Sequence, residues 1–188
     1  MGATPSRLHL DLACHALAAG GVIAYPTEAV WGLGCEPLNE HACRRVTLLK
    51  GRSAGKGYIM IASDFAQVAP FLKPLSRAQL KPALASWPGP VTWLLPAASW
   101  VPAYLTGGRK TLAVRVTAHD TAAALCAQYG GPVVSTSANA SGHAPARTAL
   151  QVQRRFGSRI DYLLPGALGG LARPTPIRDL ATRKTVRK

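Results

Sequence analysis

The 188-residue sequence is poor in acidic side chains and contains no long apolar run. Its 8 Asp and Glu residues stand against 22 Lys and Arg residues, which gives a formal net charge of +14. No apolar stretch reaches the roughly 18 residues that a membrane-spanning helix needs, and the N-terminal segment lacks the apolar centre of a secretory signal. We therefore expect a soluble, cytoplasmic protein without a membrane partner.

Cysteine is present, but not in the spacing that builds a disulfide framework or a zinc site. None of the four cysteines belongs to a C-x-x-C pair, and no regular spacing of histidines accompanies them. We expect reduced structural thiols and predict no protein-held metal. The cysteines are Cys14, Cys35, Cys43 and Cys126.

The common sequence motifs for nucleotide binding and hydrolysis are also missing. Residues 51–56 resemble a Walker loop only loosely, because their spacing differs and Gly57 follows Lys56 where Ser or Thr is needed. Gly32 and Gly34 lack the third glycine of a dinucleotide fingerprint. There is no H-E-x-x-H and no G-x-S-x-G. Any nucleotide site therefore has another design.

The excess of positive charge favours partners that carry phosphate, which are a nucleotide, RNA, or both. Much of the arginine lies in the C-terminal half of the chain. The alternative interpretation of these arginines is the solvated face of a helix, which needs no ligand.

Hydrophobic periodicity predicts alternating helices and strands without strict βαβ regularity. The expected helices are 8–19, 39–50, 76–86, 120–129 and 148–156, and the expected strands are 22–25, 58–62, 91–95, 111–116, 133–134 and 160–164. Neighbouring strands around Trp93 and Val114 indicate antiparallel pairing. Glycine and proline predict loops at 26–34 and 166–176, and Pro82 argues for a break or a shortened start of its helix. We predict one domain, residues 1–188, with a twisted mixed α/β sheet and flanking helices.

Two segments far apart in the sequence have the composition of a phosphate site. Residues 135–142 follow a strand and consist of small donors and acceptors, which let a polyanion or zwitterion approach the backbone. Lys50, Arg52 and Lys56 alternate with Gly and Ser, so their loop could wrap a triphosphate. The alternative for the second segment is an exposed basic loop. Together the segments indicate one site assembled by folding.

Arg115 is the third candidate, because it interrupts the apolar strand 111–116. On an inward face it needs a partner, and the carboxylate of a ligand would serve. The alternative is an edge strand with Arg115 facing water. Thr27 and Glu28 follow a strand and a proline, where they could orient a polar substrate or simply form a turn.

Five segments taken together resemble the YrdC/Sua5 family, the L-threonylcarbamoyladenylate synthases. They occur in the family's order, span nearly the whole chain and are specific as a set. They are residues 26–34, 50–56, 87–92, 112–116 and 135–142. The length and the ending resemble the short, single-domain bacterial form, the TsaC type, without the additional C-terminal domain of the Sua5 form.

The resemblance implies a YrdC-like fold with a basic concave cavity and a nucleotidyltransferase activity. L-Threonine, bicarbonate or CO2, and ATP accompanied by Mg²⁺ would give L-threonylcarbamoyl-AMP and pyrophosphate. The product would supply the tRNA modification t6A37. The implied partners are tRNA or other RNA and the downstream transferase complex of TsaB, TsaD and TsaE. The alternative function is a non-catalytic RNA-binding module, although RNA binding alone has no need for the small residues at 135–139.

The resemblance also implies roles for individual residues. The residues implied for ATP are Lys50, Arg52, Lys56, Thr111, Ser137, Asn139 and Arg187, with Lys50 and Arg52 as the catalytic pair. The residues implied for threonine or its carbamate are Thr27, Arg115, Ser135 and Thr175. The chain departs from the family pattern at three positions. Ser53 stands where proline is frequent, Ala29 where threonine is, and Ile61 where histidine is.

Overall fold

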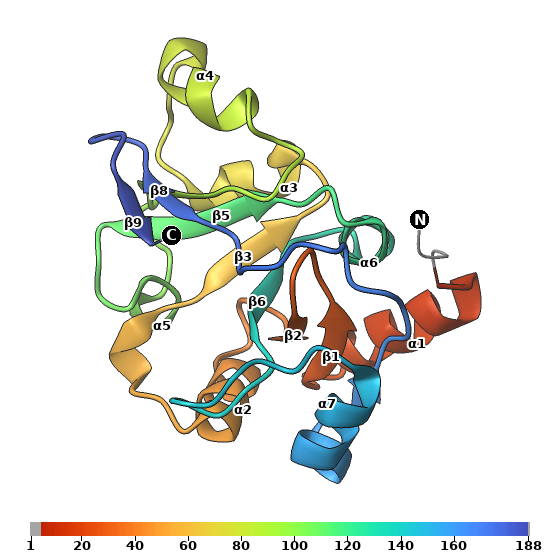
Figure 1. Ribbon diagram of the computed structural model, residues 1–188. Helices are drawn as coiled ribbons and strands as arrows, with labels where there is room; N and C mark the ends of the chain where they lie inside the picture. The colour runs from red at the N-terminus through yellow and green to blue at the C-terminus, as the bar shows by residue number, and fades with distance from the viewer. Residues whose placement is uncertain (1–4, 188) are drawn as a thin grey trace.

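The computed structural model describes residues 5–187, so both ends of the predicted 1–188 domain lie outside the described residues. Within this range nine strands form one mixed sheet in the order β7-β1-β2-β6-β3-β5-β4-β8-β9, with helices on both faces (Figure 1). The strands are β1 (Ile23–Pro26), β2 (Trp31–Gly34), β3 (Ile59–Ala62), β4 (Thr92–Pro96), β5 (Thr111–Val116), β6 (Val133–Ser137), β7 (Tyr162–Leu163), β8 (Ile177–Asp179) and β9 (Thr185–Arg187). The predicted mixed α/β sheet is confirmed.

Helices and short 3-10 turns connect these strands. The α-helices are α1 (Arg7–Ala18), α2 (Glu40–Lys50), α3 (Phe65–Val68), α4 (Arg77–Leu84), α5 (Ala103–Thr106), α6 (Asp120–Tyr129) and α7 (Ala149–Phe156). The 3-10 turns are η1 (Ala54–Lys56), η2 (Ala69–Phe71) and η3 (Gly157–Arg159). None of the helices in residues 5–187 combines the length and the hydropathy needed to cross a membrane.

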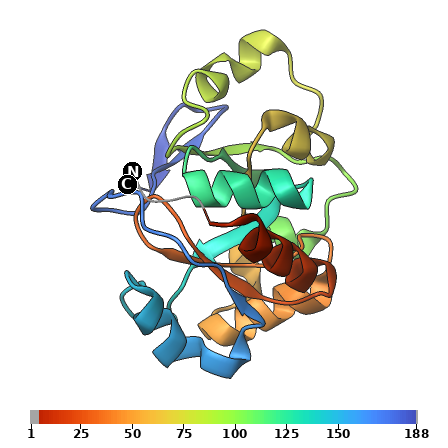
Figure 2. The same ribbon diagram turned by 90° about the vertical axis from the view of Figure 1, so that its right-hand side faces the viewer.

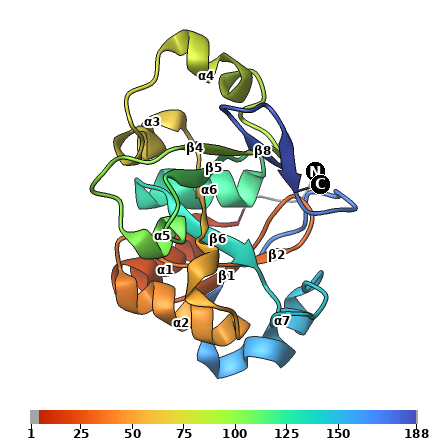
Figure 3. The same ribbon diagram turned by 90° about the vertical axis from the view of Figure 1, so that its left-hand side faces the viewer.

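Each face of the sheet buries its own apolar cluster. Helices α1 and α6 lie side by side on one face, where Leu17 and Leu125 are fully buried (Figure 2). Helices α2 and α5 lie on the other side, where Val46 and Leu105 join the larger cluster (Figure 3). Helix α4 lies apart at one end of the molecule in all three views. Burial on both faces explains why the middle strand, β3, consists only of apolar residues.

The predicted antiparallel pairing around Trp93 is confirmed, since β4 and β5 pair with Trp93 opposite Val114. On its other edge β5 pairs in parallel with β3, which brings Ile61 opposite Arg115. Arg115 is therefore on an interior strand and only 4% exposed. The alternative that placed it on a water-facing edge strand is wrong.

The end of α2 positions the first cationic segment. Asn39 begins this helix as predicted, by accepting a hydrogen bond from the backbone N–H of Ala42 (2.9 Å). Gly51 ends it with a left-handed backbone (φ 55°), so Lys50 is the last helical residue. The segment that carries Arg52 and Lys56 then crosses to β3 through η1.

The prediction of a loop over residues 26–34 is wrong in its second half, which forms β2. This strand pairs with both β1 and β6. Gly34 marks close packing rather than a turn, because a Cβ there would lie 2.5 Å from the carbonyl oxygen of Val134. Pro82 likewise lies inside α4 instead of breaking it.

The predicted end of the strand at Val134 is also wrong, because the first residues of the segment 135–142 still belong to the sheet. Strand β6 continues through Ser135, Thr136 and Ser137, which pair with β3 on one side and β2 on the other. The ladder hydrogen bonds on both edges hold these polar residues in an extended strand. The tail was predicted without strands, but β8 pairs with β4 and β9 pairs with β8, which places Arg187 in the sheet.

Candidate active site

Two adjoining pockets lie over the strands that carry the predicted site residues. The smaller has a volume of about 180 Å³ and is called the Arg115 pocket; its polar lining includes Thr27, Arg115, Ser135, Ser137 and Thr175. The larger has a volume of about 340 Å³ and is called the Arg52 pocket; its polar lining includes Arg52, Lys56, Arg109 and Thr111. Ile59, Ser135, Thr136 and Arg187 line both. The pockets therefore share a wall, and ligands in the two can meet.

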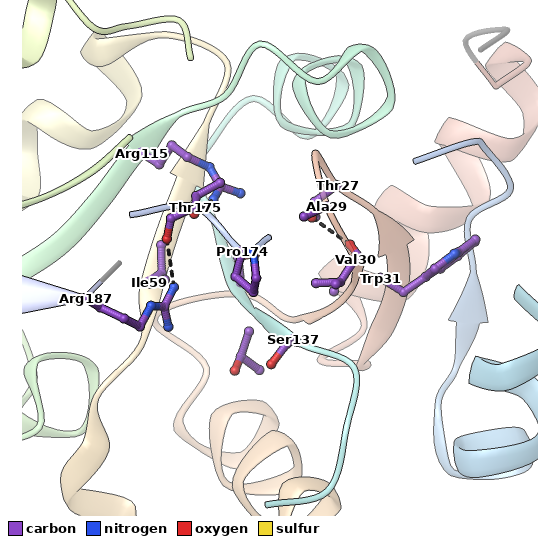
Figure 4. A pocket seen from close by; sticks show the side chains of 13 residues that line it. Thr27, Ala29, Val30, Trp31, Ile59, Arg115, Ser137, Pro174, Thr175 and Arg187 are labelled. Atoms are coloured by element: carbon purple, nitrogen blue, oxygen red, sulfur yellow. Dashed lines mark hydrogen bonds between the residues drawn. The ribbon is translucent and has the colours of Figure 1, made fainter. Parts of the chain in front are cut away.

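The Arg115 pocket is bounded by side chains from distant parts of the sequence. Arg115, Thr175 and Arg187 lie on one side, and Thr27 and Ala29 on the opposite side (Figure 4). A guanidinium nitrogen of Arg115 (Nη1) donates to the hydroxyl of Thr175 (2.7 Å), and Arg187 donates to the carbonyl of Thr175 (3.2 Å). Thr175 thus links the two arginines. Burial, with a contribution from Arg115, lowers the pKa of Arg187.

Thr27 is fixed by the tight turn between β1 and β2. Its hydroxyl donates to the carbonyl of Val30 (2.7 Å), while its own carbonyl accepts from the backbone of Gly169 (3.1 Å). The latter contact ties the turn to residues 165–176, the segment that carries Thr175. This pocket is therefore shaped by hydrogen bonds that exist without a ligand.

The Arg52 pocket is lined by four cationic side chains and no carboxylate in the part of the chain that the structure describes; the cations are Arg52, Lys56, Arg109 and Arg187. Arg52 lies over the ring of Tyr58, 4.3 Å from its centroid, and donates to the carbonyl of Gly57 (2.8 Å). Arg109 donates to the carbonyls of Lys56 (3.3 Å) and Thr106 (3.2 Å). Backbone and ring contacts thus hold Arg52 and Arg109 in place without neutralising them.

Gly57 permits the close approach that closes this loop. Its backbone is left-handed (φ 63°), and a Cβ there would lie 2.8 Å from the carbonyl carbon of Thr106. The loop of Arg52 and Lys56 therefore packs against the end of α5.

Lys50 lies against the end of β6 and lines neither pocket. Its ammonium nitrogen donates to the carbonyls of Ser137 (2.5 Å) and Asn139 (3.0 Å) and to the side-chain oxygen of Asn139 (3.1 Å). The hydroxyl of Ser137 donates to that same oxygen (2.6 Å). Burial, followed by the charges of Arg52 and Lys56, lowers the pKa of Lys50 to about 8. The predicted meeting of Lys50 with the 135–142 segment is present in the fold.

The residues implied for the nucleotide are distributed over both pockets and the loop after β6. Ser137 lines the Arg115 pocket, while Asn139 lines neither pocket and orders the loop after β6. Of the three departures from the family pattern, Ala29 lines the Arg115 pocket and Ser53 is exposed. Ile61 is fully buried under α6 and lines neither pocket.

Sequence reasoning missed several residues of the site. Arg109 follows two glycines and precedes a lysine, a pattern similar to that of the Lys50 segment, so it could have been found from the sequence. Tyr58 had no such signal, because stacking under Arg52 appears only in the fold. Among residues 5–187 no group of three His, Cys, Asp or Glu side chains could hold a metal ion.

The fold and the pockets define a mixed α/β protein with a cationic pocket beside a smaller one that contains a buried arginine. A family model for Sua5, YciO and YrdC, described as "Telomere recombination", matches residues 15–188. The chain belongs to this family. It is 58% identical to the threonylcarbamoyl-AMP synthase of Halorhodospira halophila, over 87% of this chain and 85% of that protein. It is 51% identical to the threonylcarbamoyl-AMP synthase of Thiobacillus denitrificans, over the full length of both.

Solved structures share the fold. The Sua5 protein of P. abyssi, in complex with L-threonine, superimposes with a TM-score of 0.85 at 32% identity, over 92% of this chain and 51% of that chain. The present chain thus spans about half of the length of that protein. YciO of E. coli gives a TM-score of 0.80 at 24% identity, over 98% of this chain and 94% of that one, and supports the fold alone.

Proposed function

We propose that this protein is a threonylcarbamoyl-AMP synthase of the nucleotidyltransferase class. The observation that carries the proposal is the common wall of the two pockets, formed by Ile59, Ser135, Thr136 and Arg187. Proteins that are about half identical over nearly the full length bear the name of this activity. A related structure holds L-threonine.

The proposed reaction joins one ligand from each pocket. The amine of L-threonine adds to CO2 with loss of a proton, or condenses with bicarbonate with loss of water, to form a carbamate. An oxygen of the carbamate then attacks the α-phosphorus of ATP, and the bond from that phosphorus to the bridging oxygen of pyrophosphate breaks with its electron pair. The products are L-threonylcarbamoyl-AMP and pyrophosphate. No covalent nucleophile is needed, because the work is to hold two anions together and offset the developing charge.

The Arg115 pocket suits threonine because it is small and lined by fixed hydrogen-bonding groups. Arg115 is the natural partner for the substrate carboxylate, since a guanidinium matches a carboxylate in shape and charge. Thr27, Ser135 and Thr175 supply hydroxyls around it. Ser137 lines the same pocket and follows Ser135 and Thr136 of the common wall in β6, where the carbamate would approach the phosphate.

The Arg52 pocket suits the triphosphate because its cations are not neutralised. Arg52, Lys56 and Arg109 would bind the phosphates, Thr111 lines the same pocket, and Arg187 would contact both ligands from the shared wall. Lys50 would reach a phosphate only by exchanging the carbonyl oxygens that it now binds. Mg²⁺ belongs to the substrate as MgATP, and its ligands would be the phosphates.

The product would serve formation of t6A37 in tRNA, which places the reaction in the cytoplasm. The partners in this proposal are tRNA and the transferase complex of TsaB, TsaD and TsaE, which would consume the adenylate. Exposed arginines such as Arg147 and Arg154 support contact with RNA.

The test is product formation with each substrate omitted in turn. Purified protein is incubated with L-threonine, bicarbonate and MgATP, and threonylcarbamoyl-AMP and pyrophosphate are measured by mass spectrometry and a coupled assay. Both products are expected only when all three substrates are present. If ATP binds but no adenylate forms, the proposal is wrong. RNA binding with a steep salt dependence and no product would instead favour the non-catalytic RNA-binding module.

A further inference from the structure

Glu28 is a buried carboxylate that faces Arg115 from behind the pocket. It lies in the turn between β1 and β2 and is 6% exposed. One of its oxygens (Oε2) is 3.2 Å from the guanidinium of Arg115. Glu28 is absent from the lining of both pockets. It therefore contacts the group that faces the ligand, and not the ligand itself.

The other oxygen of Glu28 (Oε1) is held by Thr117, which directly follows β5, the strand that carries Arg115. The hydroxyl of Thr117 donates to this oxygen (2.7 Å), and the same hydroxyl accepts from the backbone N–H of His119 (3.1 Å). Arg115 and Thr117 are two residues apart, so their side chains share one face of the extended chain. The carboxylate is thus fixed by two groups from one face.

The contact between Glu28 and Arg115 is not saturated. In the described part of the chain, Oε2 of Glu28 and Nε of Arg115 are buried and make no hydrogen bond, although the ion pair brings the two groups together. A buried guanidinium whose hydrogen bonds are incomplete is stabilised when an additional anion aligns with it. Thr175 already holds the nitrogen Nη1.

We propose that Glu28 is a positioning residue that orients Arg115 for the carboxylate of the amino-acid substrate. Glu28 offsets the charge of Arg115 during burial, and with Thr175 it restricts the guanidinium to one orientation. Thr117 in turn fixes Glu28. The inference rests on the proposed function for the identity of the substrate, and it assigns to Glu28 a role that acts only through Arg115.

A role in folding alone makes a different prediction. If Glu28 only stabilised the turn between β1 and β2, its removal would lower folding stability. The measured binding of both substrates would then fall together, because less protein is folded. A positioning role affects threonine selectively, because the Arg52 pocket has no contact with Glu28. The distinction therefore lies in the ratio of the two affinities.

The experiment measures L-threonine and ATP binding to the full chain by calorimetry, for wild type, Glu28→Gln, Glu28→Asp and Thr117→Val. Glu40→Gln is the control, because it makes the same chemical change on the exposed start of α2. Thermal unfolding of each variant confirms that folded protein is compared. Turnover is measured in parallel on the wild type.

We expect Glu28→Gln to weaken threonine binding by about 10- to 100-fold, since a displaced binding group costs this much, while ATP binding stays within about twofold. Thr117→Val should act in the same direction with a smaller effect, and Glu28→Asp should recover part of the loss. Unchanged or tighter threonine binding in folded Glu28→Gln would overturn the inference, as would equal losses for both ligands. Wild-type protein that binds threonine without forming the adenylate would contradict the proposed function, and the comparison of variants would still decide the role of Glu28.

Discussion

The two pockets share a wall, yet they hold their charges in opposite ways. In the Arg115 pocket the central cation is 4% exposed, lies beside Glu28 and donates to Thr175. In the Arg52 pocket none of the four lining cations forms an ion pair with a carboxylate in the described part of the chain, and Lys56 and Arg109 are exposed. The first pocket thus contains a buried cation that is paired with a carboxylate, while the second contains exposed cations that are not paired.

This difference indicates how one site can accept two unlike ligands. The first pocket has the smaller net charge, because Glu28 pairs with Arg115 and leaves Arg187, so shape and hydrogen-bond geometry decide more of its selectivity. An uncompensated pocket attracts polyanions from a distance and is sensitive to salt. We therefore expect substitutions in the Arg115 pocket to lower both folding stability and threonine affinity. Substitutions in the Arg52 pocket should lower the affinity for ATP alone.

The largest effect is expected from Arg115→Met, measured by urea unfolding. This change leaves the carboxylate of Glu28 buried without its cation, and breaking a buried ion pair costs about 3–5 kcal/mol. The double variant Glu28→Gln/Arg115→Met should recover most of that loss, because neither charge is then unpaired. A stability close to that of the wild type for Arg115→Met would show that the pair is not compensated as the fold indicates.

Arg52→Ala should lower kcat/KM for ATP by about 100-fold, because one oriented donor to a developing charge is typically worth this much. Its folding stability should change little, since Arg52 is half-exposed and its hydrogen bond is to a loop carbonyl. Arg154→Ala on the exposed side of α7 is the matched control. Equal rates for the two variants in a pyrophosphate-release assay would remove Arg52 from the site.

A smaller effect, of up to about tenfold per pH unit, is expected in ATP affinity above pH 8. The pKa of Lys50 is lowered to about 8 from 10.5. Between these two values Lys50 is therefore neutral in the folded chain and still protonated in the unfolded chain. Because the unfolded chain binds more protons there, the free energy of unfolding rises with pH from 8 to 10.5, and this contribution is absent below pH 8. The neutral amine attracts phosphate less. Calorimetry on wild type and Lys50→Arg should give a decline only for the wild type; parallel profiles would exclude Lys50 as the cause.

The smallest effect on ligands is expected from Ile61→Val. Ile61 pairs with Arg115 across the sheet, but its side chain belongs to the core under α6. Loss of one methyl group should lower the free energy of unfolding by about 1 kcal/mol and leave both affinities within about twofold. A selective loss of threonine binding would place this position in the Arg115 pocket after all.

The boundaries of helices and strands could be predicted best from the sequence where local signals and burial agree. Strand β5 and helix α6 begin and end at the predicted residues, because an apolar run and the helix-ending Gly130 both mark the boundaries. Strand β2 was missed since Gly34 reads locally as a turn, while its actual role is close contact with Val134. That role depends on a neighbouring strand far along the chain.

Several residues that the sequence singled out line the two pockets, but their arrangement was not predicted. Residue types alone were enough to single out the cations of residues 50–56 and the isolated Arg115 as candidate site residues. The partner of Arg115 could not be read from the sequence, because Glu28 reaches it only after the turn between β1 and β2 folds against β5. The side on which Ser137 lies was likewise decided by the strand register, with Ser137 opposite Gly32.

The most direct test of the account is the affinity of two variants for both ligands. Calorimetry would measure L-threonine and ATP binding to Arg115→Lys, which keeps the charge but loses the planar fork, and to Arg52→Ala. The account predicts a crossed pattern, in which Arg115→Lys loses threonine and keeps ATP while Arg52→Ala loses ATP and keeps threonine. Loss of the same ligand in both variants would contradict the assignment of the two pockets.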